Sequence, residues 1–163
     1  SVATFDNWVS KTANLLVDTS TPINLENADG VLIIVQHGGT TDGNVAVTVH
    51  EGATAADCTS GTYVLDVESG STPGHEFFIW KNVDTDVSDT NVRQANGVTV
   101  TLDTDAGSGK QMLIYYVPAS ALTPGRKFVN VGIAVGNVAN WMSVLYILDG
   151  GRYQQTTPPT ATS

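Results

Sequence analysis

The sequence predicts an all-β protein: a single antiparallel β-sandwich or jelly-roll-like domain of about eight or nine strands. Two observations support this prediction. Apolar residues recur with a period of two far more often than with the helical period, and clusters of Gly, Asn, Asp and Pro separate nearly every apolar run. A chain of 163 residues is long enough to bury a full core. We therefore expect one layered β domain that needs no disulfide or metal ion to stabilise it.

Three segments alternate between apolar residues and polar or small ones. They are residues 45–50, 98–103 and 129–135. In each segment Val, Ile or Leu occupies every second position, which is typical of a strand with one face in the core and the other in water. We expect these segments to be ordinary two-faced strands.

Four other segments are apolar on both faces: residues 31–35, 76–80, 112–117 and 141–148. Such segments are typical of central strands, or of strands whose outer face contacts another chain. For 112–117 and 141–148 both alternatives stay open. The sequence gives almost no indication of helix, and the best candidate for a helical segment is a single turn at residues 118–122.

The two ends of the chain differ from its middle. Residues 1–14 carry Phe5 and Trp8 in a polar setting and are expected to form an N-terminal arm or a first strand. Residues 15–153 make up the predicted β domain. Residues 154–163 contain two adjacent prolines and no apolar side chain larger than Ala, so we expect a flexible Thr/Pro-rich tail.

The charge balance argues against some partners. Sixteen acidic and seven basic side chains give a formal net charge of −9. Nucleic-acid binding requires clustered Lys and Arg, and the basic residues here are scattered, so we expect no nucleic-acid partner. We also expect no membrane partner, because no apolar run is long enough to span a bilayer. The first residues lack the features of a secretory signal, which favours a protein made and used without export.

No residue pattern indicates catalysis or cofactor binding, and we predict no catalytic and no cofactor-binding residues. The serine-containing turns lack the Gly-x-Ser-x-Gly elbow of a nucleophile. Cys58, the only cysteine, lies in a polar segment expected to be a loop, without a basic neighbour that would activate it. His37, His50 and His75 lack the spacing of metal ligands, so we interpret each as a solvated histidine at a strand edge.

Acidic residues in predicted loops are candidates for Ca²⁺ ligands. They are Asp84, Asp86 and Asp89 in one segment and Asp103 and Asp105 in another. Carboxylates at such spacing often supply oxygen ligands for Ca²⁺, but neither segment has the twelve-residue spacing of an EF-hand. We therefore favour exposed, solubilising carboxylates and predict no metal site. A Ca²⁺ titration followed by melting temperature separates the two alternatives.

The last third of the chain carries a longer pattern. Tyr115, Tyr116 and Val117 precede a turn with Ala119 and Leu122, an alternating strand at 129–135, the run Tyr146, Ile147 and Leu148, and finally Arg152 and Tyr153. This order resembles the final strands of small structural proteins of tailed-phage particles. The tail at 154–163 is not part of that pattern.

The resemblance implies a capsid decoration, or cement, protein of a tailed bacteriophage. Such a protein would be made in the host cytoplasm, bind the outer surface of the assembled capsid and stabilise it without enzymatic activity. The implied partner is the major capsid protein, and the implied assembly is a homotrimer on the virion exterior. The interface residues that we expect are Phe5, Trp8, Trp141, Tyr146, Arg152 and Tyr153.

A carbohydrate-binding or adhesin-type β-sandwich module is the alternative. Trp8, Trp80 and Trp141 are available to stack on sugar rings, although aromatic residues in strands are more often part of the core. A hydrolase is disfavoured because no pair of carboxylates stands out as catalytic. Binding to capsids, as opposed to binding to glycans, distinguishes the two functions.

Overall fold

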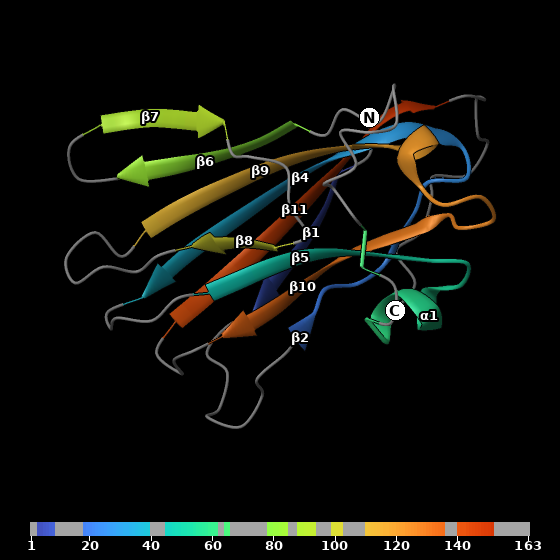
Figure 1. Ribbon diagram of the computed structural model, residues 1–163, viewed down its shortest axis with the longest axis horizontal. Helices are drawn as coiled ribbons and strands as arrows, with labels where there is room; N and C mark the ends of the chain where they lie inside the picture. Colours follow the sequence, from blue (N-terminus) through green and yellow to red (C-terminus); the bar gives the residue numbers. More distant parts are fainter. Residues whose placement is uncertain are drawn as a thin grey trace.

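A computed structural model describes the chain at residues 3–8, 18–39, 45–61, 64–65, 78–84, 88–93, 99–102, 110–135 and 140–151. These residues are mostly β-strands, which form two antiparallel sheets accompanied by one short α-helix (Figure 1). The predicted all-β class is therefore confirmed. Within this part of the chain there are eleven strands, two of them only two residues long.

The larger sheet contains six strands in the order β1-β11-β4-β9-β6-β7, and each pair of neighbours is antiparallel. Its strands are β1 (Ala3–Trp8), β11 (Asn140–Gly151), β4 (Ala28–Gly39), β9 (Lys110–Pro118), β6 (Phe78–Asp84) and β7 (Ser88–Arg93). The segments predicted to be apolar on both faces lie in β4, β9 and β11, and residues 78–80 of the fourth lie in β6, while residues 76–77 are outside the described residues. All four are interior strands of this sheet.

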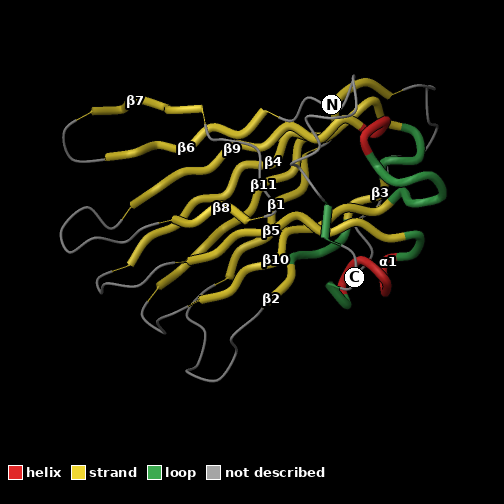
Figure 2. Tube along the Cα trace, in the orientation of Figure 1, coloured by secondary structure: helices red, strands yellow, loops and turns green. Residues whose placement is uncertain are grey.

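The smaller sheet contains the strands β2, β10, β5 and β8 in that order, with β3 pairing to β10 as well. Their bounds are β2 (Asp18–Thr19), β3 (Ile23–Asn24), β5 (Val45–Gly52), β8 (Thr99–Leu102) and β10 (Phe128–Val135). The three segments with strict alternation correspond to β5, β8 and β10. Strands with one polar face thus gather in this sheet, and the doubly apolar strands are in the larger one. Figure 2 shows the strands of both sheets as yellow segments along the chain trace.

The buried side chains of the two sheets belong to a single core. Val31, Ile33, Leu113 and Tyr146 come from the larger sheet, and residues such as Val47 come from the smaller one. The Tyr146 hydroxyl joins the two sheets, because it hydrogen-bonds the Ser20 hydroxyl and accepts the backbone N–H of Val131 (3.0 Å). Aliphatic contacts and one buried polar bridge therefore hold the sheets together.

Two short helical segments accompany the sheets. The 3₁₀ turn η1 (Ala119–Ala121) falls within the single turn predicted at 118–122. The helix α1 (Ala55–Thr59) was not predicted. It begins with a capping box in which Thr54 Oγ1 accepts the N–H of Asp57 and Asp57 Oδ2 accepts the N–H of Thr54, both at 3.1 Å. None of the helices in the described residues is long and apolar enough to cross a membrane.

The N-terminal strand β1 is an edge strand of the larger sheet and pairs with β11 along its whole length. The opposite edge is β7, which pairs with β6. Residues 1–2, 9–17 and 152–163, which include much of the predicted N-terminal region and all of the predicted tail, lie outside the described residues.

Candidate interaction surface

The outer face of the larger sheet is apolar across its three central strands. Side chains on the inner side of β4, such as Val31, Ile33 and Val35, are fully buried in the core. Residues in the alternate phase point the opposite way because successive side chains in a strand face opposite sides. We name these half-buried residues the apolar face: Leu32 and Ile34 of β4, Met112, Ile114 and Tyr116 of β9, and Leu145 and Ile147 of β11.

Strand register arranges the apolar face in rows. Ile34 pairs with Leu145 on one side and with Ile114 on the other, and Leu32 pairs in the same way with Ile147 and Tyr116. Paired side chains in neighbouring antiparallel strands lie about 4.5–5.5 Å apart at Cβ. The rows therefore form one continuous patch rather than isolated apolar side chains.

The backbone register of these rows continues into the flanking strands. Phe5 of β1 pairs with Leu145, and Trp80 of β6 pairs with Ile114. The row centred on Ile34 thus runs through five adjacent strands, from β1 to β6. All five sequence positions in this row carry large aliphatic or aromatic residues.

The corresponding surface of the smaller sheet has a different composition. Its outward positions include Ala46 and Thr48 of β5, Thr99 and Thr101 of β8 and Ala134 of β10, which are half-buried or exposed. Small and polar residues of this kind suit a strand surface in water. Because only one of the two sheets is apolar on its outer side, the apolar face is a specific feature of β4, β9 and β11.

Polar groups border the apolar face at both ends of the strands. Gln36 is exposed at one end, where its Oε1 accepts a long hydrogen bond from Ser143 (3.5 Å). At the other end the Tyr116 hydroxyl donates to Asp149 Oδ2 (3.0 Å). Partial burial, followed by the bond to Asp149 and the charges of Asp149 and Asp29, raises the pKa of Tyr116, so its hydroxyl stays protonated at neutral pH. The rim at this end is acidic.

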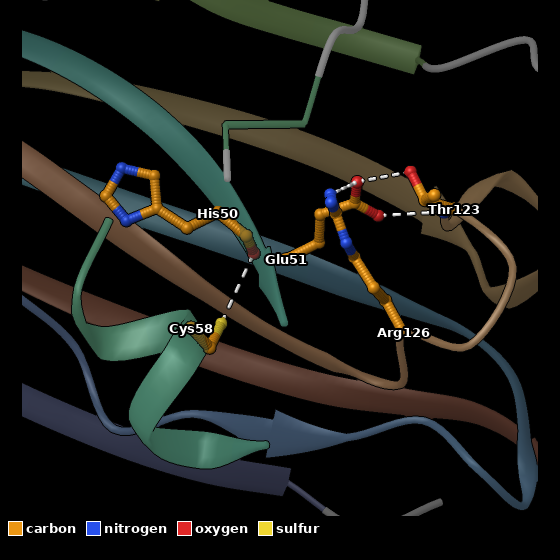
Figure 3. Close-up of polar contacts among 5 residues, drawn as sticks. All are labelled: His50, Glu51, Cys58, Thr123 and Arg126. Carbon is orange, nitrogen blue, oxygen red and sulfur yellow. Dashed lines mark hydrogen bonds and ion pairs between the residues drawn. The ribbon is translucent and has the colours of Figure 1, made fainter. Parts of the chain in front are cut away.

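A separate cluster of buried polar residues lies where β5 meets α1 (Figure 3). Cys58 was expected in a polar loop, but it is fully buried on α1. Its sulfur lies 3.5 Å from the carbonyl oxygen of His50 and 3.3 Å from Asn130 Oδ1, two acceptors within reach of its single S–H. Burial raises the pKa of the Cys58 thiol to about 12, so the group is protonated and is not a nucleophile at neutral pH.

His50 was expected to be solvated, and this expectation is wrong. Its exposed fraction is 4% because α1 and the turn that follows it cover this part of β5. Burial lowers the pKa of the imidazole, while the nearby Asn130 amide acts in the opposite direction. The alternation of the sequence placed position 50 on the polar side of the strand. Nothing in the residues of that strand indicates that a helix covers this side.

The next residue, Glu51, is buried on the other side of β5. Its carboxylate accepts the backbone N–H and the hydroxyl of Thr123 at 2.9 and 2.6 Å. It also binds the Arg126 guanidinium at 2.5 Å (Figure 3). The carboxylate fixes the turn between η1 and β10, and this structural use of all three groups explains why an acidic side chain lies at the end of the core.

One expected interface residue is corrected by the structure. Tyr146 has no exposed surface, and its hydroxyl is bound inside its own chain, so it does not face a partner. Its neighbours Leu145 and Ile147 are on the apolar face instead. Phe5 and Trp8 lie in β1 and Trp141 in β11, where the structure describes the backbone only. Arg152 and Tyr153 lie outside the described residues.

The Ca²⁺ candidates fall largely outside the described part of the chain. Asp84 ends β6 and Asp89 lies in β7, while Asp86, Asp103 and Asp105 are not described. Among the residues that the structure does describe, no group of three or more His, Cys, Asp or Glu side chains is arranged to hold a metal ion.

Comparisons of this chain with known protein families, with curated proteins and with solved structures find no match. The functional argument therefore depends on the apolar face and on the residue pattern of the C-terminal strands.

Proposed function

We propose that the protein is a structural virion protein that binds the outer surface of an assembled phage capsid and stabilises it. The observation that carries this proposal is the apolar face. Five of its seven residues come from β9 and β11, which are two of the three strands in the C-terminal pattern that resembles tailed-phage structural proteins; the third is β10. The pattern that suggests the class of protein and the surface that suits a partner are thus in the same strands.

We propose further that the two sheets, with their shared core, are the layers of a β-sandwich or jelly-roll-like domain. Two closely spaced sheets form a rigid unit, and a rigid surface loses little conformational entropy when it binds. Such a unit suits a protein whose role is to reinforce a shell. Residues 15–153 are the proposed domain.

The composition of the apolar face supports docking on another protein. Its seven residues are uncharged, although the chain as a whole is strongly acidic. Protein interfaces have a core depleted of charge and enriched in aliphatic and aromatic side chains, with a polar rim around it. Covering the face removes apolar area from water, at about 25 cal/mol per Å² before the costs of association. Contiguous apolar surfaces of this kind are typical of interaction sites.

The rim indicates the chemistry of the partner. Asp149 is exposed beside Tyr116, next to Asp29, so one end of the face carries negative charge. We propose that the partner, the major capsid protein, presents an apolar patch bordered by Lys or Arg at that end. Complementary charge of this kind sets orientation and speeds encounter more than it adds affinity. A homotrimer on the capsid exterior is the proposed assembly.

The proposed role needs no enzymatic activity. Three groups with catalytic potential have structural uses: the Cys58 thiol is buried and protonated, the His50 imidazole is buried under α1, and the Glu51 carboxylate is bound by Arg126 and Thr123. These arrangements support a structural protein over a hydrolase.

A co-sedimentation experiment tests this function. The probe is an assembled shell of the major capsid protein encoded in the same genome, and the variants are Ile34→Glu and Thr101→Glu. Ile34 is at the centre of the apolar face, whereas Thr101 is an exposed strand residue on the outside of the smaller sheet. We expect Ile34→Glu to lose shell binding at least tenfold and Thr101→Glu to keep it, with unfolding midpoints confirming that both variants are folded.

Equal binding of Ile34→Glu and the wild type would contradict the assignment of the apolar face. Failure of the wild type to bind shells, combined with glycan binding that Tyr116→Ala abolishes, would favour the carbohydrate-binding alternative.

A further inference from the structure

His50 occupies a tightly enclosed place on the outer side of the smaller sheet. It shares that side with Thr48 of the same strand and with Asn130 and Gly132 of β10, which pair with His50 and Thr48, respectively. A Cβ atom on Gly132 would overlap Cε1 of the imidazole, and a Cβ on Gly61 would lie 3.2 Å from the same atom. The ring fits only because both neighbours are glycines.

The hydrogen bonds of His50 define its tautomer. Nε2 lies 3.0 Å from Thr48 Oγ1, and that hydroxyl donates to the carbonyl oxygen of Gly132 (3.3 Å). A hydroxyl has one proton to donate, so Thr48 accepts the hydrogen bond from Nε2–H. The neutral ring therefore carries its proton on Nε2, and Nδ1 holds the lone pair. Nδ1 is buried, and no described residue meets the hydrogen-bond geometry toward it.

Protonation of His50 would place a charge where no described group compensates it. On β5, the Glu51 carboxylate extends away from the imidazole and is bound by Arg126 and Thr123 (Figure 3). On α1, the Asp57 carboxylate accepts hydrogen bonds from the backbone N–H and the hydroxyl of Thr54, and Cys58 is a neutral thiol. From β10, Asn130 and Gly132 are uncharged; the Asn130 side chain favours the protonated ring, but by less than burial disfavours it.

We propose that mild acid opens the α1 corner of the protein by protonating His50, because no carboxylate among the described residues around the ring compensates the new buried charge. A buried charge without an opposite charge beside it loses its hydration and gains little in return. The ring escapes this penalty only by reaching water, which requires α1 and the turn at Gly61 to move away.

The direction of the pH dependence follows from the folded and open states. Burial lowers the pKa of His50 in the folded protein, whereas the open state has the ordinary value of 6.5. Between these two values the open state binds a proton that the closed state does not. The closed state is therefore most stable above pH 6.5 and loses stability as the pH falls below it, by at most tenfold in the opening equilibrium per pH unit.

Cys58 is a built-in reporter of this opening. It is the only cysteine of the chain, it is fully buried, and its sulfur contacts the carbonyl oxygen of His50 and the side chain of Asn130. Movement of α1 away from β5 and β10 breaks both contacts and exposes the sulfur. The corner also lies on the opposite sheet from the apolar face, so this inference does not depend on capsid binding.

The experiment measures the labelling rate of Cys58 by 4,4′-dithiodipyridine, a reagent that reacts with thiols in mildly acidic solution. The full-length protein is labelled at several values between about pH 7.5 and 5, and each rate is divided by that of the denatured chain at the same pH. We expect the protection of Cys58 to fall by up to tenfold per pH unit below 6.5. His50→Gln, which keeps an N–H donor near Thr48, should show a flat profile.

His37→Gln is the matched control, because it removes a different histidine from the chain and should keep the wild-type slope. Wild-type protection that does not change with pH, or a His50→Gln slope equal to that of the wild type, would overturn the proposal. Nitrogen-15 NMR of the wild-type imidazoles gives a second test that requires no variant. An Nε2–H tautomer and titration below pH 6.5 support the proposal, and an Nδ1–H tautomer or titration at or above 6.5 overturns it.

Discussion

Replacement of Glu51 by Gln tests whether the buried carboxylate stabilises the end of the core. In the wild type the carboxylate accepts two hydrogen bonds from Thr123 and one, charge-assisted, from Arg126. Gln has nearly the same shape but only one accepting oxygen, and its amide N–H₂ would face donors of Thr123 or Arg126. The substitution therefore removes the charge and leaves at least one donor without an acceptor, with little change in packing volume.

The expected loss of stability is about 2–3 kcal/mol. Removing one partner of a buried ion pair costs roughly 3–5 kcal/mol when the remaining charge stays buried. Here the Arg126 side chain is 23% exposed against 3% for Glu51, so the guanidinium can recover part of its hydration. This partial exposure lowers the expected cost below that range. A double-mutant cycle with Arg126→Gln should give a coupling energy of about 1–2 kcal/mol.

The assay is equilibrium urea unfolding at pH 7, followed by tryptophan fluorescence. Glu26→Gln is the matched control, because Glu26 binds Lys127, the residue next to Arg126, at a comparable distance of 2.8 Å, but the Glu26 and Lys127 side chains are 54% and 40% exposed. Exposed ion pairs contribute little to stability, so this control should leave the unfolding midpoint almost unchanged. Equal effects of the two Glu→Gln substitutions, or no effect of Glu51→Gln, would refute the role given to the buried carboxylate.

Three other substitutions probe separate features, each measured by urea unfolding. Gly132→Ala should cost about 2–3 kcal/mol, because its Cβ overlaps the enclosed His50 ring; an unfolding midpoint equal to the wild type would contradict this packing. Tyr146→Phe should cost about 1 kcal/mol, because it removes the hydroxyl that bridges to Ser20 while the Val131 N–H keeps Ser20 Oγ as an acceptor at 2.8 Å; an unfolding midpoint equal to the wild type would show that the bridge adds nothing. Gly125→Ala should cost about 1 kcal/mol, from its φ of +89° alone, since no atom lies within 4 Å of the new Cβ, and a loss as large as that of Gly132→Ala would be inconsistent with this open environment.

Much of the strand layout could be predicted from the sequence because strand periodicity is a local signal. The alternating segments at 45–50, 98–103 and 129–135 became β5, β8 and β10, whose inner residues are buried in the core. The doubly apolar segments became interior strands of the other sheet. Alternation depends only on neighbouring residues, so it survives without knowledge of the tertiary structure.

The orientation of the doubly apolar strands could not be predicted. When both phases of a strand are apolar, the sequence does not say which phase faces the core. Tyr146 was therefore expected at an interface, whereas the structure buries it with Val144 and turns Leu145 and Ile147 outward. The sequence left open whether these strands are central or contact another chain. In the structure one face of each strand packs in the core, and the other face belongs to the apolar face.

The buried polar cluster was missed for a different reason. Helix α1 is only five residues long and carries no apolar period, so its signal is the capping box between Thr54 and Asp57. That local pattern could have predicted the helix. The burial of His50 and Cys58 could not have been predicted in the same way. It results from α1 packing on β5 and on β10, and β10 lies far from α1 in the sequence.

We propose that the protein binds a capsid shell through the outer face of β4, β9 and β11. Cryo-electron microscopy of capsid shells saturated with the protein tests this claim most directly, because the orientation of the two sheets on the shell becomes visible. We expect Leu32, Ile34 and Ile114 to lie against the capsid surface and α1 to point away from it. A map in which α1 and the smaller sheet contact the shell, while the apolar face is open to solvent, would contradict it.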